Sequence, residues 1–116
     1  MRERLRRDLT AAIQAHDSIQ VASLRSALAA IDNAGAPGAA GVSLITTHSE
    51  YFGAGVAGVG AAEVSRRVLT QAEATDLIRD EMAQRLRAAD QYCQLGRRDA
   101  ADRLLAEVDV LTRYVQ

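Results

Sequence analysis

Four segments of this 116-residue chain repeat apolar side chains at spacings of three and four residues. This spacing places the apolar side chains on one face of an α-helix. The pattern predicts helices over residues 2–15, 18–34, 71–95 and 99–115. Because an apolar face has to be covered, we expect these helices to pack on one another or on a partner.

The predicted apolar faces differ in width. The first helix presents Leu5, Leu9, Ala12 and Ile13. The second and fourth have narrow seams at Val21, Leu24, Leu28 and Ile31 and at Leu104, Val108, Leu111 and Val115. The third presents Ile78, Met82, Leu86, Ala89 and Cys93, flanked by Leu77 and Tyr92. The two seams suit an internal core and a partner helix equally well, so both interpretations stay open.

Capping residues mark where three of these helices begin. Gln20 follows Asp17 by three residues, and Glu73 follows Thr70 by three, which is the spacing of a capping box. We expect Asp99 to cap the fourth helix.

Glycines mark where helices end. We expect Gly35 just after the second helix, where Pro37 two residues later blocks continuation. We expect Gly96 just after the third helix. Short breaks then join the first helix to the second and the third to the fourth. The sequence therefore predicts an all-α, four-helix bundle-like arrangement of two αα-hairpins within a single domain, residues 1–116.

A long segment rich in glycine and alanine connects the two predicted hairpins. Residues 35–62 contain seven glycines, seven alanines and one charged residue, Glu50. Few of these side chains can offset the entropy lost on ordering, so we expect a flexible linker. Residues 42–46, VSLIT, are expected to form at most a short extended piece.

The same segment contains a G-x-G-x-x-G pattern at Gly53, Gly55 and Gly58. A dinucleotide-binding turn needs a strand directly before the first glycine and a second parallel strand after the helix. Residues 48–52, HSEYF, separate the first glycine from the short extended piece, and the chain after Thr70 has the pattern of helices. We therefore expect a linker here, and no nucleotide or other cofactor.

Composition narrows the function classes. The formal net charge is −1, so strong nonspecific binding to nucleic acid is not expected, and we expect no DNA partner. The chain contains no apolar run of the ~20 residues that cross a membrane, no apolar leader and a single cysteine. These features indicate a cytoplasmic protein without a membrane partner.

The sequence offers little catalytic or metal-binding chemistry. The soft metal ligands His16, His48 and Cys93 lie far apart, so we expect no metal site. We interpret Cys93 as a small core residue, because it lies on an apolar face. No nucleophile–base pair or paired acids appear, so we expect no catalytic residue and no catalysis by this chain alone.

Charged pairs four residues apart are expected to support helix surfaces. They are Glu81 with Arg85 and Asp99 with Arg103.

All fourteen basic residues are arginines, and two groups stand out. They are Arg2, Arg4, Arg6 and Arg7 at the start of the chain, and Arg97 and Arg98 at the last break. A solvated helix surface is the simpler interpretation of these arginines. Contact with RNA phosphates is the alternative, although the aromatic residues that stack on single-stranded bases make up only 3% of the chain.

Two stretches of the chain resemble the GatB/YqeY family. The first is RERLRRDLTAAIQAHDSIQVASLRSALAAI, with an A-x-D turn and a Leu-Arg in its second helix. The second is LTQAEATDLIRDEMAQRLRAADQYCQLGRRDAADRLLAEVDVLTRYV, with Leu-Thr before a Glu and an aromatic before GR-x-D. The chain departs from the family in its longer linker and in stopping at RYVQ, where fuller members continue into a second helical domain.

The resemblance implies an all-α domain related to the tail of the B subunit of tRNA-dependent amidotransferases. Those enzymes are carbon–nitrogen ligases with glutamine as the amido-nitrogen donor, and the tail helps to hold the tRNA. The resemblance thus implies an accessory or adaptor module, with tRNA or a tRNA-charging or tRNA-amidating enzyme as partner. The six arginines of the two groups are then the expected phosphate contacts. The alternative is a helical protein-interaction module or homodimer without RNA contact.

Overall fold

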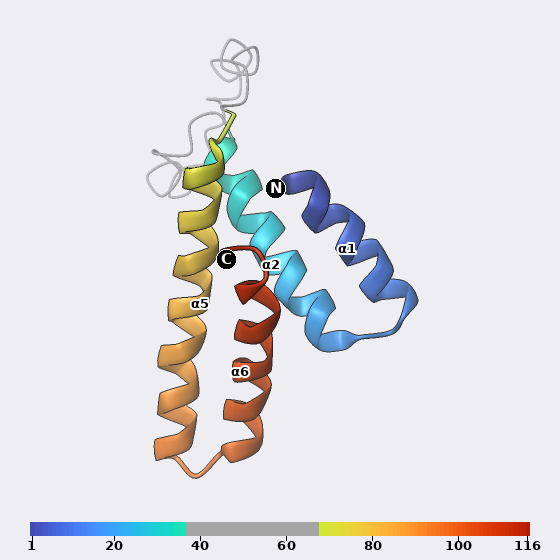
Figure 1. Ribbon diagram of the computed structural model, residues 1–116. Coiled ribbons are helices and arrows are strands. Elements are labelled where there is room, and N and C mark those ends of the chain that lie inside the picture. Colours follow the sequence, from blue (N-terminus) through green and yellow to red (C-terminus); the bar gives the residue numbers. More distant parts are fainter. Residues whose placement is uncertain (37–67) are drawn as a thin grey trace, which may run out of the picture.

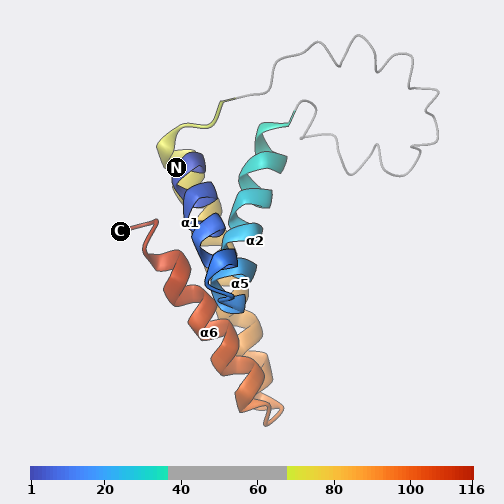
Figure 2. The same cartoon turned by 90° about the vertical axis from the view of Figure 1, so that its right-hand side faces the viewer.

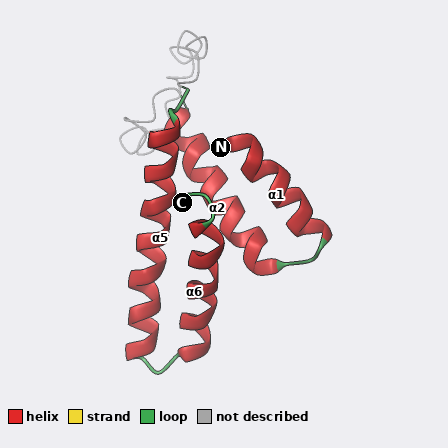
Figure 3. Ribbon diagram, in the orientation of Figure 1, coloured by secondary structure: helices red, strands yellow, loops and turns green. Residues whose placement is uncertain are grey.

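Helices make up most of the part of the chain that the structure describes. The structure is a computed structural model that describes residues 1–36 and 68–116. In these ranges it has no strand and four helices, α1 (Arg2–Gln14), α2 (Ser18–Gly35), α5 (Gln71–Gln94) and α6 (Arg98–Thr112) (Figures 1 and 3). The predicted all-α arrangement of two αα-hairpins is confirmed.

The predictions for the connecting segment fall largely outside these ranges. Most of the predicted linker, residues 35–62, lies outside the described residues, as do the extended piece at 42–46, His48 and the glycine pattern at 53–58. Gly35 is described, and it is the last residue of α2 rather than the first residue after it.

The helix α2 lies at the centre of the fold. It contacts α1, α5 and α6, whereas α5 and α6 pack along each other as a long antiparallel hairpin. In Figures 1 and 2 the hairpin continues beyond the end of α2 where Ser18 lies, so its far part has no third helix beside it.

Each helix contributes one large apolar side chain that is fully buried. These are Leu5 of α1, Leu24 of α2, Ile78 of α5 and Leu111 of α6, each 0% exposed. They belong to one core cluster, with Leu28 and Ile31 of the predicted α2 seam. Complete burial of such a side chain contributes roughly 2 kcal/mol, so these four contacts hold both hairpins together.

Three side chains of the predicted apolar faces are exposed instead. Leu86 is 47% exposed, Ile13 is 46% exposed, and Cys93 is exposed. The interpretation of Cys93 as a core residue is therefore wrong. Leu86 and Cys93 both lie in the second half of α5, but Ala89 between them is only 3% exposed, so the side of the helix decides which of these residues is covered.

Capping bonds confirm two of the three predicted helix starts. The Thr70 side chain accepts from the Glu73 backbone at 3.1 Å, and the Glu73 carboxylate accepts from the Thr70 backbone at 3.0 Å. The Asp17 carboxylate accepts a bond of 3.1 Å from the Gln20 backbone. The prediction for Asp99 is wrong, because α6 begins one residue earlier than expected and Asp99 lies in its first turn.

Both hairpin turns use the same backbone arrangement. The turn after α1 has His16 at φ 55°, and the turn after α5 has Gly96 at φ 78°. The next backbone N–H donates back into the helix in each case, from Asp17 to Ala12 at 3.0 Å and from Arg97 to Tyr92 at 2.8 Å. These are the bonds of a Schellman motif, in which a left-handed residue ends the helix. Glycine adopts this conformation at little cost, and histidine does not.

We expect opposite effects on stability from substitutions at the two left-handed positions. Replacing Gly96 by Ala adds a Cβ that meets no atom within 4 Å. Its cost is therefore conformational, and we expect a loss of about 1 kcal/mol. Replacing His16 by Gly should instead stabilise the fold by about 0.5 kcal/mol. Urea unfolding followed by circular dichroism measures both, and equal signs would contradict the assignment of the turns.

Candidate nucleic-acid interface

Two of the six candidate arginines hold α1 to the rest of the fold. An Arg2 guanidinium nitrogen lies 2.7 Å from an Asp32 carboxylate oxygen, which joins α1 to α2. The Arg4 guanidinium lies 4.5 Å from the centre of the Tyr114 ring and donates to the Arg113 carbonyl at 3.3 Å. Both side chains therefore already have contacts within the chain.

The other arginines of α1 point into solvent. Arg6 is exposed and has no ion-pair partner among the described residues. The Arg7 side chain is 75% exposed and lies 3.8 Å from the neighbouring Asp8, a distance at which attraction is weak in water. Arg6 and Arg7 are thus the two α1 arginines that are free to meet a ligand.

The second arginine group lies at the turn between α5 and α6. The Arg97 side chain is 60% exposed, 3.6 Å from Asp99 and 6.0 Å from the centre of the Tyr92 ring. Arg98 is exposed and without an ion-pair partner in the described part of the chain.

The fold does not bring the two arginine groups together. The N-terminus lies near one end of the molecule, and the α5–α6 turn lies at the other (Figures 1 and 2). Within one copy of the chain, the six candidate residues form two separate sites rather than one continuous patch.

Both arginine groups begin at helix N-termini that lack a side-chain cap, and each first turn also contains one acid, Glu3 in α1 and Asp99 in α6. The N-caps are Met1 for α1 and Arg97 for α6, and neither side chain accepts a capping bond. The other two helices are capped by Asp17 and Thr70. A helix N-terminus carries a partial positive charge that favours anions, and nearby guanidinium groups increase the local positive potential. The two ends therefore share a chemistry suited to phosphate.

A tyrosine secures the end of the chain against α1. Tyr114 is 3% exposed, and its hydroxyl donates to the Asp8 carboxylate. Burial, followed by the bond to Asp8, raises the pKa of this hydroxyl from 10.0 to about 12. This contact keeps the arginine-bearing face of α1 in a fixed position relative to α6.

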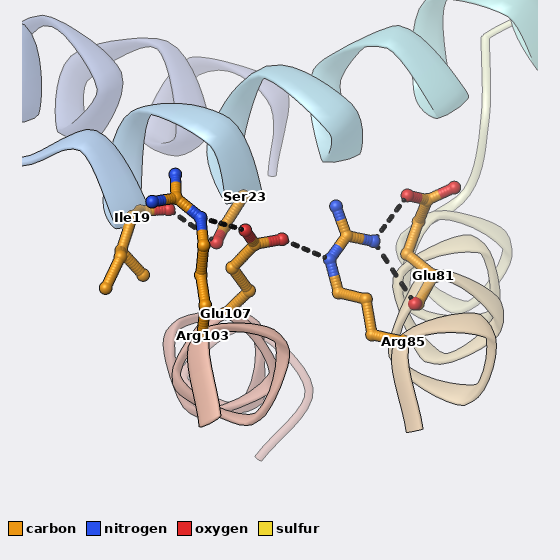
Figure 4. A network of polar contacts seen from close by, with 6 residues as sticks. All are labelled: Ile19, Ser23, Glu81, Arg85, Arg103 and Glu107. Carbon is orange, nitrogen blue, oxygen red and sulfur yellow. Dashed lines mark hydrogen bonds and ion pairs between the residues drawn. The ribbon is translucent and has the colours of Figure 1, made fainter. Parts of the chain in front are cut away.

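A network of four charged side chains lies where α2 meets the hairpin. Arg85 of α5 donates to the Glu107 carboxylate of α6 at 2.8 Å and to the Glu81 carboxylate at 2.9 Å. Arg103 lies 3.5 Å from the second oxygen of Glu107. Figure 4 shows Glu107 between the two arginines, beside Ser23 of α2.

This network differs from the two surface pairs expected from the sequence. The side chains of Arg85 and Glu107 are only 12% and 9% exposed, so the predicted Glu81–Arg85 pair is part of an interhelical link. Burial lowers the pKa of the Arg85 guanidinium, but the bonds to Glu107 and Glu81 outweigh it and raise that pKa overall. The Asp99–Arg103 pair is not formed, because Arg103 turns to Glu107 and Asp99 lies near Arg97.

Metal-ligating residues do not cluster in the described ranges. No group of three His, Cys, Asp or Glu residues there could hold a metal ion. A pocket of about 270 Å³ lies where α2 ends and α1 and α5 begin. Its lining is mainly apolar, with Ile31, Leu69 and Ala74, and includes Arg2. The described helices also include none that is long and apolar enough to cross a membrane.

Comparison with known proteins gives no match to this chain from family models, curated proteins or solved structures.

The buried charge network gives a stability prediction. Replacing Glu107 by Gln leaves Arg85 with one carboxylate partner in a largely buried position, so we expect a loss of about 3 kcal/mol. The matched control is Arg103→Gln, which removes only the half-exposed arginine and should cost less than about 1 kcal/mol. Urea unfolding measures both. Equal costs would show that burial of the Arg85–Glu107 pair has no energetic importance.

The Tyr114–Asp8 bond gives a prediction about pH. A hydroxyl with a raised folded-state pKa stabilises the fold below the unfolded pKa, and that contribution is lost as pH rises. Stability should therefore fall between about pH 10 and pH 12, by up to about 2 kcal/mol. The variant Tyr114→Phe should lose this drop, whereas Tyr92→Phe, at an exposed tyrosine, should retain it. Chemical unfolding at a series of pH values measures the free energy of unfolding of the wild type and both variants.

Proposed function

We propose that this protein is an accessory module that contacts RNA phosphates through its exposed arginines and does not catalyse a reaction alone. The observation that carries the proposal is the coincidence of two features at both ends of the molecule. Each arginine group lies at a helix N-terminus without a side-chain cap, and each includes a guanidinium that has no ion-pair partner among the described residues, Arg6 or Arg98.

Arginine is the side chain best suited to this role. Its planar guanidinium donates two parallel hydrogen bonds to a phosphate, and it stays charged at every physiological pH. The formal net charge of the chain is −1, so attraction to RNA has to come from these local sites. Binding should then be moderate in strength and strongly dependent on salt.

Because of the resemblance to the GatB/YqeY family, we propose that the RNA is a tRNA. The two stretches that carry the resemblance coincide with the two hairpins, α1–α2 and α5–α6. We therefore propose that the partner is a tRNA or a complex of tRNA with a charging or amidating enzyme.

Fluorescence anisotropy with end-labelled tRNA tests the proposal. The variants Arg6→Gln/Arg7→Gln and Arg97→Gln/Arg98→Gln each remove two candidate contacts. Each should weaken binding by about tenfold at low salt and reduce the slope of log K against log [salt] by about 1 to 2.

The matched control is Arg25→Gln/Arg103→Gln. Both arginines are exposed and lie outside both groups, and the half-exposed Arg103 has only its contact of 3.5 Å with Glu107 to lose. The control removes the same charge, so it should change affinity by less than about threefold. An equal loss of affinity in the control would show that RNA is attracted by overall charge and not by the two arginine groups. No binding by the wild-type chain at tens of micromolar and low salt would refute the RNA proposal.

A further inference from the structure

One side of α5 carries mainly exposed residues. Arg79, Ala83, Leu86 and Asp90 follow one another along it at spacings of four, three and four residues, and all but the half-buried Ala83 are exposed. We call these four residues the outer stripe. Their spacing is that of a coiled-coil seam, and Leu86 at its middle is 47% exposed. The two seams expected to suit a partner lie largely in the internal core, whereas Leu86 at the centre of this stripe is open to a partner.

The two ends of the outer stripe carry opposite charges. Arg79 lies at one end and Asp90 at the other, with Ala83 and Leu86 between them. Beside the stripe, Asp80 and Arg87 are one heptad apart, and both are exposed. Neither has an ion-pair partner in the part of the chain that the structure describes. Such an arrangement is complementary to itself when it is turned end to end.

We propose that the outer stripe binds a second copy of this chain, with the two α5 helices antiparallel about a two-fold axis between Ala83 and Leu86. Ala83 then meets the partner's Leu86, so a large side chain fills the space beside a small one. Arg79 meets the partner's Asp90 at each end of the stripe. In the same register, Asp80 meets the partner's Arg87 on the flank, as charged flanking positions do in coiled coils.

Charge also sets the direction of pairing. A parallel pair would place Arg79 against the partner's Arg79 and Asp90 against the partner's Asp90, and like charges repel at these positions. Antiparallel pairing converts the same residues into opposite-charge contacts, repeated twice by the symmetry. Isologous contacts of this kind are the commonest in homo-oligomers.

The contacts that these residues make within one copy do not obstruct the pairing. Arg79 lies 3.6 Å from Asp76 and donates to the Val115 carbonyl at 3.4 Å, and Asp90 accepts from Gln94 at 2.9 Å. All three contacts are at the exposed surface, where exchange of partners costs little. Because the apolar centre is small, we expect a weak dimer, with a dissociation constant of roughly micromolar to tens of micromolar.

A charge-swap experiment on the full chain tests the interface. In Asp80→Arg, an arginine meets the partner's Arg87, and in Arg87→Asp, an aspartate meets the partner's Asp80. Each variant alone should dimerise about tenfold more weakly than the wild type by sedimentation velocity. An equimolar mixture of the two variants restores both opposite-charge contacts and should form a heterodimer. The control Asp102→Arg changes an exposed acid of α6 and should dimerise like the wild type.

Disulfide trapping tests the register. The same alignment places Asp76 opposite the partner's Cys93, which is an exposed thiol. The variant Asp76→Cys should therefore form a covalent dimer under mild oxidation much faster than the wild type or Asp102→Cys. A wild-type chain that is monomeric at several hundred micromolar, a mixture of variants that does not associate, or trapping no faster than in Asp102→Cys would overturn the proposal.

Discussion

The packing of α2 against the other three helices is the contact on which the fold depends. Ser23, Leu24 and Ala27 of α2 are each 0% exposed. Two of these side chains are small, which lets neighbouring helices approach closely. The Ser23 hydroxyl donates to the Ile19 carbonyl at 2.7 Å, so its burial leaves no polar group without a partner. Without α2, α1 and the α5–α6 hairpin would share little apolar surface.

The limited length of α2 explains where the polar and exposed features of the hairpin lie. It has 18 residues, whereas α5 has 24. The Arg85–Glu107 pair lies near the end of the region that α2 covers, where burial is sufficient to strengthen the pair and α6 supplies its carboxylate. Leu86, one residue further along α5, lies about 100° around the helix from Arg85 and stays 47% exposed. The length of α2 and the side of α5 on which a residue lies together decide which side chains stay exposed.

Short-range patterns in the sequence predicted the helices and their starts. They did not predict which side chains of different helices contact each other. Thr70 with Glu73 and Asp17 with Gln20 act within one turn, so their spacing is sufficient to mark a helix start. The sequence could not predict burial of Glu107, because its partner Arg85 is 22 residues away and the pairing depends on how α5 and α6 align. It likewise placed Cys93 in the core, because periodicity shows which side chains share a face and does not show how far a neighbouring helix extends.

The two proposals are connected by the geometry of the hairpin. Met1 and Arg2 line the same pocket as Leu69 and Ala74, so α1 and α5 begin at the same end of the molecule. The other arginine group lies at the far end of α5. An antiparallel α5 pair places the far end of one copy beside the beginning of its partner's α5. The α5–α6 turn of one copy and the α1 end of its partner would then lie at the same end of the dimer. A phosphate backbone long enough to reach both arginine groups would favour the dimer, so RNA binding and self-association would strengthen each other.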